Sequence, residues 1–171
     1  IVDNVIPQHL DALISKLQEM GVEMELVGDS IVVYGRKGQL KAVDVKTQIY
    51  PGFATDLQQP MTALMTQAQG VSHVRETIYQ TRFKQCEELN RMGAKCQTEA
   101  PMAHIEGPTQ LMGCDVSATD LRCGAAMIIA GLMANGVTTI HNVYHIDRGY
   151  DGIEGKLIAL GAKIWREVEE D

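Results

Sequence analysis

An internal repeat constrains the fold of this chain more than any other feature. Residues 70–95 match residues 136–163 at a spacing of 66 positions, which becomes 68 after a two-residue insertion. The tetrapeptide Ala-Thr-Asp-Leu occurs at 54–57 and again at 118–121, and a fainter third copy covers residues 17–21. Because self-similarity at a fixed period is typical of repeated supersecondary units, we expect three copies of one structural unit.

The middle copy predicts the order strand, helix, strand, helix, strand, strand. Alternating apolar and polar residues indicate strands, a 3.6-residue period indicates helices, and Gly93 is typical of the position just after a helix. The expected elements are strand 42–46, helix 56–68, strand 71–78, helix 83–92, strand 95–99 and strand 102–106. Four of the nine methionines fall at helical-core spacing and should pack in the interior, namely Met61, Met65, Met127 and Met133.

The copies on either side are shorter. The third predicts strand 114–118, helix 120–134, strand 137–143, helix 151–160 and strand 162–167, without a last strand. The first predicts only helix 8–20 and a hairpin of strands 23–27 and 31–35. We therefore expect one α/β domain with units at about 1–37, 38–110 and 111–171. Its outer units are incomplete, so other parts of the native chain or a partner should complete it, and a first residue that is Ile and not Met agrees with this.

Composition excludes several classes of function. The chain has 171 residues, of which 45% are hydrophobic and 22% charged, as in soluble globular proteins. A formal charge of −7 argues against a basic face that binds nucleic acid. The longest apolar stretch, 125–134, is too short to cross a bilayer, and no basic-then-apolar segment opens the chain. These features predict a cytoplasmic protein without a membrane partner.

The cysteines and glycines indicate no cofactor. The four cysteines form no Cys-x-x-Cys pair, which argues against a structural metal site, and a chain of this length and apolar content needs no disulfide scaffold. We expect four reduced and mostly buried thiols, at Cys86, Cys96, Cys114 and Cys123. No phosphate-binding or dinucleotide-binding glycine motif is present, so a nucleotide is expected only as part of a substrate.

Three segments carry a resemblance to a known family. The stretches YPGFATDLQQP (50–60), ATDLRCGAAMIIAGLMANGVT (118–138) and YHIDRGYDGIEGKLIALGA (144–162) resemble the UDP-N-acetylglucosamine enolpyruvyl transferases, and the resemblance covers essentially the whole chain. It implies repeated βαβαββ units of an inside-out barrel, with helices inside and sheets outside. It also implies two domains of three units each, with the substrates bound in the cleft between them.

The resemblance implies an activity as well. Such an enzyme transfers the enolpyruvyl group of phosphoenolpyruvate to a hydroxyl of UDP-N-acetylglucosamine and releases phosphate, in peptidoglycan synthesis, with no metal and no organic cofactor. This chain would be most of the second domain, without the first domain and its general-acid cysteine, and would be inactive alone. Two alternatives remain open, an enzyme like enolpyruvylshikimate-phosphate synthase and a non-catalytic binding module built on the same repeat.

Asp56 and Ile78 are the residues that the resemblance assigns to the sugar nucleotide. Asp56 matches the aspartate that contacts the sugar hydroxyl, which implies a general base that removes the hydroxyl proton. Its alternative role is to stabilise the positive end of a helix. Ile78 matches a position that touches the sugar nucleotide through its backbone, so its side chain is not constrained.

Asp120, Arg122 and Arg148 are assigned by the resemblance to the phosphoenolpyruvate end of the cleft. A helix start and an arginine suit an anion, although Asp120 could be a cap and Arg122 a solvated cation. Arg148 matches a mobile arginine that closes over phosphoenolpyruvate, and Gly149 would let its loop move. The alternative for Arg148 is a surface ion pair with Asp147 or Asp151.

Three nearby residues are assigned no chemistry. We expect Arg82, the repeat partner of Arg148, to hold the fold together. His145 is expected to anchor a loop, with its ring bonded to neighbouring backbone. Cys123 stands where relatives carry a small residue, and we interpret it as a substitution and not as a catalytic thiol, although its neighbourhood could lower its pKa.

Overall fold

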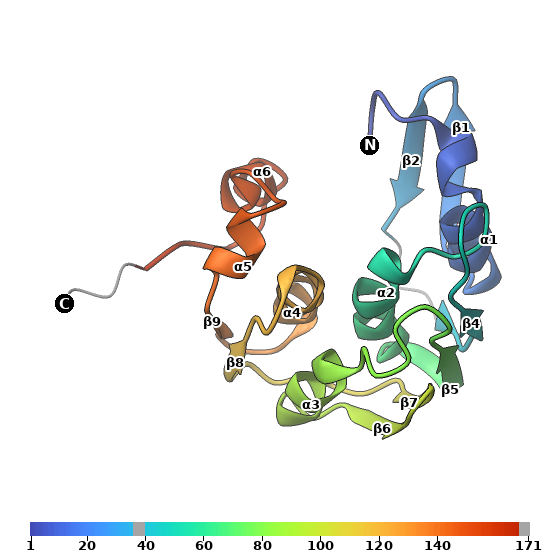
Figure 1. Cartoon of the computed structure of the whole chain (residues 1–171). Helices are drawn as coiled ribbons and strands as arrows, with labels where there is room; N and C mark the ends of the chain where they lie inside the picture. Colours follow the sequence, from blue (N-terminus) through green and yellow to red (C-terminus); the bar gives the residue numbers. More distant parts are fainter. Residues whose placement is uncertain (36–39, 168–171) are drawn as a thin grey trace.

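The middle unit has the element order that the repeat predicts. The computed structural model describes residues 1–35 and 40–167 (Figure 1). In the middle unit these residues form β3 (Leu40–Lys41), β4 (Val45–Lys46), the 3-10 turn η2 (Thr55–Leu57), α2 (Gln58–Met65), β5 (Ala68–Arg75), α3 (Lys84–Arg91), β6 (Lys95–Glu99) and β7 (Met102–Gly107). Strand β5 runs parallel to β3 and β4 and antiparallel to β7, and β7 pairs with β6. The parallel pairing follows from the helical crossover through α2.

The outer units repeat parts of this plan. The third consists of β8 (Asp115–Ser117), α4 (Leu121–Met133), β9 (Thr139–His141), α5 (Tyr144–Asp147) and α6 (Ile153–Ala159). Its strands β8 and β9 are parallel and are joined through α4, as β4 and β5 are joined through α2. The first consists of the 3-10 turn η1 (Pro7–Leu10), α1 (Asp11–Glu19) and the antiparallel hairpin β1 (Glu23–Val27) and β2 (Ser30–Tyr34).

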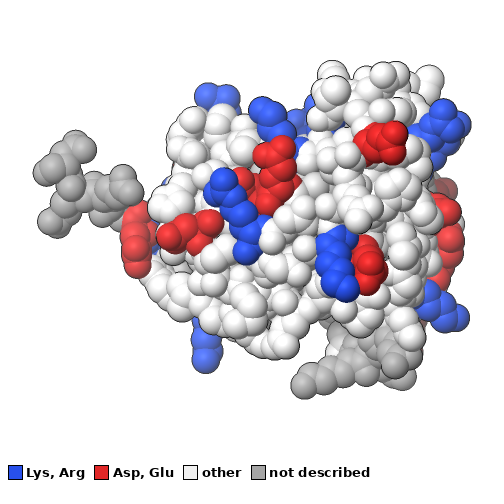
Figure 2. Space-filling view, turned by 90° about the horizontal axis from the view of Figure 1, so that it is seen from below, with Lys and Arg blue, Asp and Glu red and all other residues white. Residues whose placement is uncertain are grey.

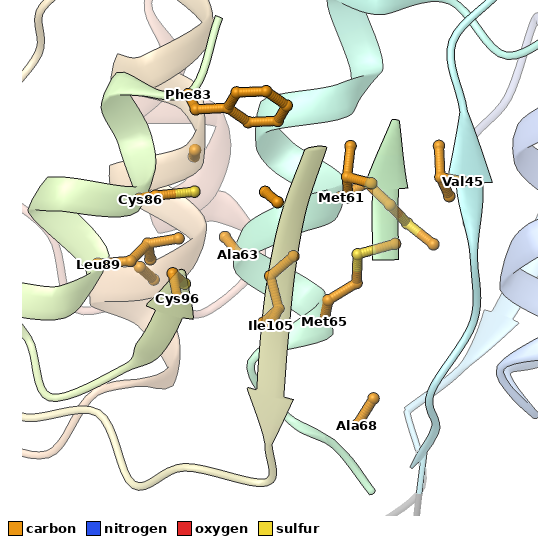
Figure 3. Close-up of a cluster of buried hydrophobic side chains, with 14 of the residues drawn as sticks. Val45, Met61, Ala63, Met65, Ala68, Phe83, Cys86, Leu89, Cys96 and Ile105 are labelled. Carbon is orange, nitrogen blue, oxygen red and sulfur yellow. The ribbon is translucent and has the colours of Figure 1, made fainter. Parts of the chain in front are cut away.

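Helices α2 and α4 lie side by side in the interior, with strands on the outside (Figure 1). Ala63 on α2 and Ala126 and Ala130 on α4 are fully buried, and such small side chains let two helices approach closely. Met65 and Met127 are also fully buried and fill the space between the elements (Figure 3 shows Met65). The packing role predicted for the helical methionines is therefore confirmed at these positions, and the expected arrangement of inner helices and outer sheets is present.

The predicted strand 162–167 is wrong. Residues 162–167 adopt no regular structure and are mostly exposed. A strand is stabilised by hydrogen bonds to a neighbouring strand, and no strand among the described residues pairs with this segment. The sequence also gave no indication of α5, which occupies part of a stretch expected to be a loop.

Side chains alter two other predicted strands. Of the predicted strand 42–46 only residues 45–46 form a strand, β4, because the N–H of Val43 donates to the Ser72 hydroxyl while Asp44 accepts the N–H of His73. Strand β3 lies just before the predicted range. Strand 71–78 is shifted to 68–75, and the chain beyond it bends around the carboxylate of Glu76. In both places a side chain takes a hydrogen bond that a regular ladder would have made between backbones.

The four cysteines are free thiols, as expected, and Cys86, Cys96 and Cys123 are buried. Cys86 and Cys96 lie in the core with Leu89 and Phe83 (Figure 3).

Charges are mixed on the surface that Figure 2 shows, where Lys and Arg side chains lie beside Asp and Glu and form no extended field of one sign. No helix in the described part of the chain is long and apolar enough to cross a membrane.

A substitution at Leu89 tests how much this core contributes to the free energy of unfolding. Its side chain is fully buried on α3, so Leu89→Ala should lower the free energy of unfolding by about 2–5 kcal/mol through lost burial and a residual cavity. Leu160→Ala removes the same atoms from a residue that is 79% exposed and should change the unfolding free energy little. Urea denaturation of both variants checks this, and equal losses would contradict the assigned core.

Candidate active site

A carboxylate from the middle unit meets a guanidinium from the third. Asp56 lies in η2, just before α2, and its Oδ1 accepts a hydrogen bond from Nε of Arg122 at 2.5 Å. A second guanidinium, that of Arg82, places Nη1 at 3.6 Å from the same oxygen. The Asp56 side chain is 58% exposed, against 29% for Arg122 and 19% for Arg82. The carboxylate therefore remains open to solvent while both arginines are largely enclosed.

Asp56 stands in the first turn of η2, near the positive end of the helix, but it makes no capping hydrogen bond there. Neither η2 nor α2 has a side-chain hydrogen bond at its N-terminal cap, so the carboxylate of Asp56 serves the arginines instead. Arg122 is not a solvated cation either, because its Nε is bound to Asp56. The structure thus brings together two of the residues singled out in the sequence, together with Arg82, which was expected only to hold the fold.

The arginine contact sets the charge state of Asp56. The hydrogen bond from Arg122 holds the pKa of Asp56 below its usual value, and this effect outweighs partial burial, which alone would raise it. The same contact raises the pKa of Arg122. Asp56 is consequently ionised at neutral pH, and its affinity for a proton rises whenever Arg122 turns to another anion.

Asp120, the repeat counterpart of Asp56, makes different contacts. It is the N-terminal cap of α4, and its Oδ1 accepts the backbone N–H of Arg122 at 2.8 Å and of Cys123 at 2.9 Å. The capping alternative is therefore correct for Asp120 in this structure. The carboxylate of Asp120 accepts hydrogen bonds from N–H groups that could otherwise bind an external anion. The same bonds fix the backbone from which the Arg122 side chain extends.

Glu76 belongs to the site but was not singled out in the sequence. Its side chain is fully buried and accepts four hydrogen bonds, from Oγ1 of Thr47 (2.6 Å), Oγ1 of Thr55 (2.8 Å), N of Ile78 (2.9 Å) and N of Tyr79 (3.1 Å). Burial alone would raise the pKa of Glu76, but these hydrogen bonds outweigh it and lower the pKa. One signal could have revealed it. Glu76 alternates in phase with Ser72 and Val74, so the strand pattern already turns it inward.

Ile78 is connected to Asp56 through this carboxylate. The N–H of Ile78 binds one oxygen of Glu76, while Thr55, the neighbour of Asp56, binds the other. Arg82 completes the connection, since its Nη1 donates to the Thr55 hydroxyl at 3.0 Å and its guanidinium lies 4.0 Å from the centre of the Tyr79 ring. The turn at 76–79 and the turn at 55–57 are therefore held as one assembly.

Arg148 is not joined to this cluster by its side chain. It is exposed at the end of α5, 5.9 Å from the centre of the Tyr144 ring, and no carboxylate in the described part of the chain pairs with it. Its suggested partner Asp147 binds Arg166 instead, at 2.7 and 2.9 Å. The Arg148 loop nevertheless lies beside the site, because a Cβ on Gly149 would approach Leu121, at the start of α4, to 2.9 Å.

The structure shows what surrounds three further residues, Gly149, His145 and Cys123. Gly149 has no left-handed backbone angle, and a Cβ there would crowd the end of the Leu121 side chain. The expected movement of its loop stays a prediction. The expected bond from the His145 ring to backbone is not found among the described residues, and the ring stacks on Tyr144 with centroids 4.2 Å apart. Burial raises the pKa of Cys123, which therefore is not an activated thiol. Within the described ranges, no three His, Cys, Asp or Glu side chains gather in a group that could hold a metal ion.

Comparisons with known proteins identify the family. The profile of the family described as EPSP synthase (3-phosphoshikimate 1-carboxyvinyltransferase) matches residues 1–157. The chain belongs to this family. Among curated relatives, it is 56% identical to UDP-N-acetylglucosamine 1-carboxyvinyltransferase 2 of Bacillus subtilis and 57% identical to the protein of that name from Geobacillus kaustophilus, over all 171 residues. The chain spans about 40% of the length of these relatives.

Solved structures of this family share the fold. The enolpyruvyl transferase NikO from Streptomyces tendae superimposes with a TM-score of 0.84 at 29% identity, over 90% of this chain and 36% of that one. EPSP synthase from Acinetobacter baumannii gives a TM-score of 0.65 at 18% identity, over 91% of this chain and 36% of that one, which supports the fold alone. The expected α/β fold of enolpyruvyl transferases is thus confirmed.

Proposed function

We propose that this chain is part of an enzyme that transfers the enolpyruvyl group of phosphoenolpyruvate to a hydroxyl of UDP-N-acetylglucosamine and releases phosphate. The observation that carries the proposal is the contact between Asp56 and Arg122. It places a carboxylate suited to proton abstraction beside a guanidinium suited to an anion, so an acceptor hydroxyl and phosphoenolpyruvate would lie next to each other. The relatives with 56–57% identity carry the name of this activity.

The residues divide the chemistry between them. Asp56 accepts the proton of the sugar hydroxyl while the oxygen of that hydroxyl bonds to the enolpyruvyl carbon. Ile78 holds the sugar nucleotide through its backbone. Arg122 and Arg148 bind the anionic groups of phosphoenolpyruvate, and Asp120 contributes by fixing Arg122. When Arg122 turns to phosphoenolpyruvate, its hold on Asp56 weakens and the carboxylate becomes a stronger base, which couples substrate binding to base strength. The methyl group of the tetrahedral intermediate then loses a proton as phosphate leaves, which restores the carbon–carbon double bond of the enolpyruvyl group.

The remaining parts of such an enzyme lie outside these residues. We propose that residues 1–171 form most of the second of two domains, in units of about 1–37, 38–110 and 111–171. The first domain would supply the acid that protonates phosphoenolpyruvate, and closure of the cleft would exclude water from the intermediate. We also propose that the enzyme works in the cytoplasm, with neither a nucleic-acid nor a membrane partner.

Phosphate release by the full-length protein tests this proposal. With phosphoenolpyruvate present, we expect release with UDP-N-acetylglucosamine and none with shikimate 3-phosphate. The opposite preference would favour the shikimate-type alternative, and release with neither acceptor would favour a non-catalytic module. The high identity over the whole chain to relatives named for the sugar nucleotide supports the first outcome.

The isolated chain provides a separate prediction. Residues 1–171 alone should show no turnover with both substrates, because the proposed acid and the opposite wall of the cleft are not among them. The measurement is the same phosphate assay at high protein concentration. Substrate-dependent release by the isolated chain would contradict the proposed division of labour between two domains.

A further inference from the structure

We propose that Glu76 is a positioning residue that keeps Asp56 facing Arg122 and joins it to the backbone at Ile78, so that both form one subsite for the acceptor sugar. This inference deepens the proposed function and rests on it for the identity of the acceptor. The geometric part concerns only how the carboxylate of Glu76 controls the Thr55–Asp56 turn. It can be tested without any substrate.

The chain contains its own comparison, because Ala-Thr-Asp-Leu occurs in two units. In the middle unit the Thr55 hydroxyl donates to Glu76, Thr55–Leu57 forms a 3-10 turn, and Asp56 points to Arg122. In the third unit the equivalent Thr119 hydroxyl finds no oxygen or nitrogen partner within the described ranges. There the backbone of Asp120 is extended, with φ −159° and ψ 175°, and its side chain turns back onto its own helix.

The difference between the two units coincides with Glu76. The repeat offset of 66 places Asn142 at the equivalent position, and Asn142 is an exposed residue with φ 60° that has no hydrogen bond to Thr119. The same tetrapeptide therefore adopts two conformations, and the 3-10 turn occurs where a buried carboxylate binds the threonine. A repeat unit can also form without such a carboxylate, so Glu76 is not required by the element order of the unit itself.

The bonds of Glu76 are directed at the candidate site and not at the core. Its Oε2 holds Thr55, next to Asp56, and its Oε1 holds the N–H groups of Ile78 and Tyr79. Three of its four donors come from the turns at 55–57 and 76–79, and the fourth is Thr47, directly after β4. An ionised carboxylate can accept all four bonds, whereas an amide of the same size offers one acceptor oxygen and adds two N–H donors.

The first test is the structure of the full-length Glu76→Gln variant without substrates. We expect the Thr55–Asp56 turn to relax toward the conformation of Thr119–Asp120, and the Asp56 carboxylate to leave Nε of Arg122. The matched control is Glu88→Gln, since Glu88 is also a buried carboxylate that accepts a backbone N–H, from Ser117 at 2.9 Å. An unchanged contact between Asp56 and Arg122 in Glu76→Gln would overturn the proposal.

The second test separates positioning from folding. In Glu76→Gln the KM for UDP-N-acetylglucosamine should rise about 10- to 100-fold, the effect expected for lost hydrogen bonds to a charged group, while the KM for phosphoenolpyruvate changes less than threefold. Its melting temperature should resemble that of Glu88→Gln. Equal changes in both KM values together with a much lower melting temperature would show that Glu76 only supports the fold, and this would overturn the proposal.

A variant of Thr55 decides the matter if Glu76→Gln fails to fold. Thr55→Val removes the hydroxyl that donates to Glu76 and accepts from Arg82 and keeps the shape of the side chain, whereas Thr55→Ser keeps the hydroxyl. We expect the valine variant to raise the KM for the sugar nucleotide about tenfold and the serine variant to behave like wild type, and similar behaviour of both would overturn the proposal. Should wild-type protein use no sugar nucleotide, the proposed function fails, while the structural test of the Asp56 contact still stands.

Discussion

Asp56→Asn in the full-length enzyme should lower kcat by about 100- to 10,000-fold, the usual contribution of a positioned general base. The amide has nearly the shape of the carboxylate but cannot take up the hydroxyl proton. The side chain is 58% exposed and caps no helix, so the melting temperature should change little. Steady-state phosphate release and thermal unfolding measure the two effects.

Asp44→Asn is the matched control for this prediction. Asp44 is likewise an exposed carboxylate bonded to another side chain, with its Oδ1 at 2.8 Å from Nδ1 of His73, but it lies outside the cluster of Asp56 and the two arginines. Its variant should retain wild-type kcat. A large loss of stability in Asp56→Asn with normal turnover would mean that the carboxylate serves the fold and not the reaction.

Arg122→Ala should lower kcat/KM for phosphoenolpyruvate by about 100- to 1,000-fold, comparable to the removal of one group that stabilises charge in a transition state. The loss should appear for phosphoenolpyruvate more than for the sugar nucleotide, because the guanidinium is proposed to bind the anion. Arg91→Ala is the control, since Arg91 is 64% exposed and pairs with Glu88 on α3. Equal KM values for phosphoenolpyruvate in wild type and Arg122→Ala would contradict the assigned role.

The same variant has a pH signature with a definite sign. Arg122 is the main cause of the lowered pKa of Asp56, so its removal raises that pKa toward the ordinary value. A general base works only when it is ionised, and activity falls as the pH drops through its pKa. The acidic limb of the kcat/KM profile should therefore lie at higher pH in Arg122→Ala than in wild type. A shift to lower pH, or an unmoved limb, would exclude Asp56 as the group that titrates.

The repeat predicted the element order because each copy has the same apolar periodicity. That information is local, and it located α3, the β6–β7 hairpin and α4 closely. It failed at residues 162–167, because a strand depends on a neighbour that the segment's own pattern does not specify. It also failed at β3 and β4, where Ser72 intervenes from 29 positions away.

The candidate site was only partly predictable for a related reason. The sequence placed Asp56 and Arg122 at equivalent helix starts in two units, but a spacing of 66 residues does not reveal that their side chains touch. The identical tetrapeptides also do not reveal that Asp56 binds an arginine while Asp120 caps α4. Glu76, which binds the Thr55 hydroxyl of the first tetrapeptide, belongs to neither of them. Such differences arise from tertiary contacts, which the local sequence pattern does not specify.

A double-mutant cycle on kcat of the full-length enzyme tests most directly whether Asp56 and Arg122 act together in one active site. Groups that work as a unit are strongly non-additive, so the second substitution costs little once the first is made. We predict that Asp56→Asn combined with Arg122→Ala will be about as slow as Asp56→Asn alone, within about threefold. A combined loss equal to the product of the two single losses would show that the residues act independently and would contradict this account.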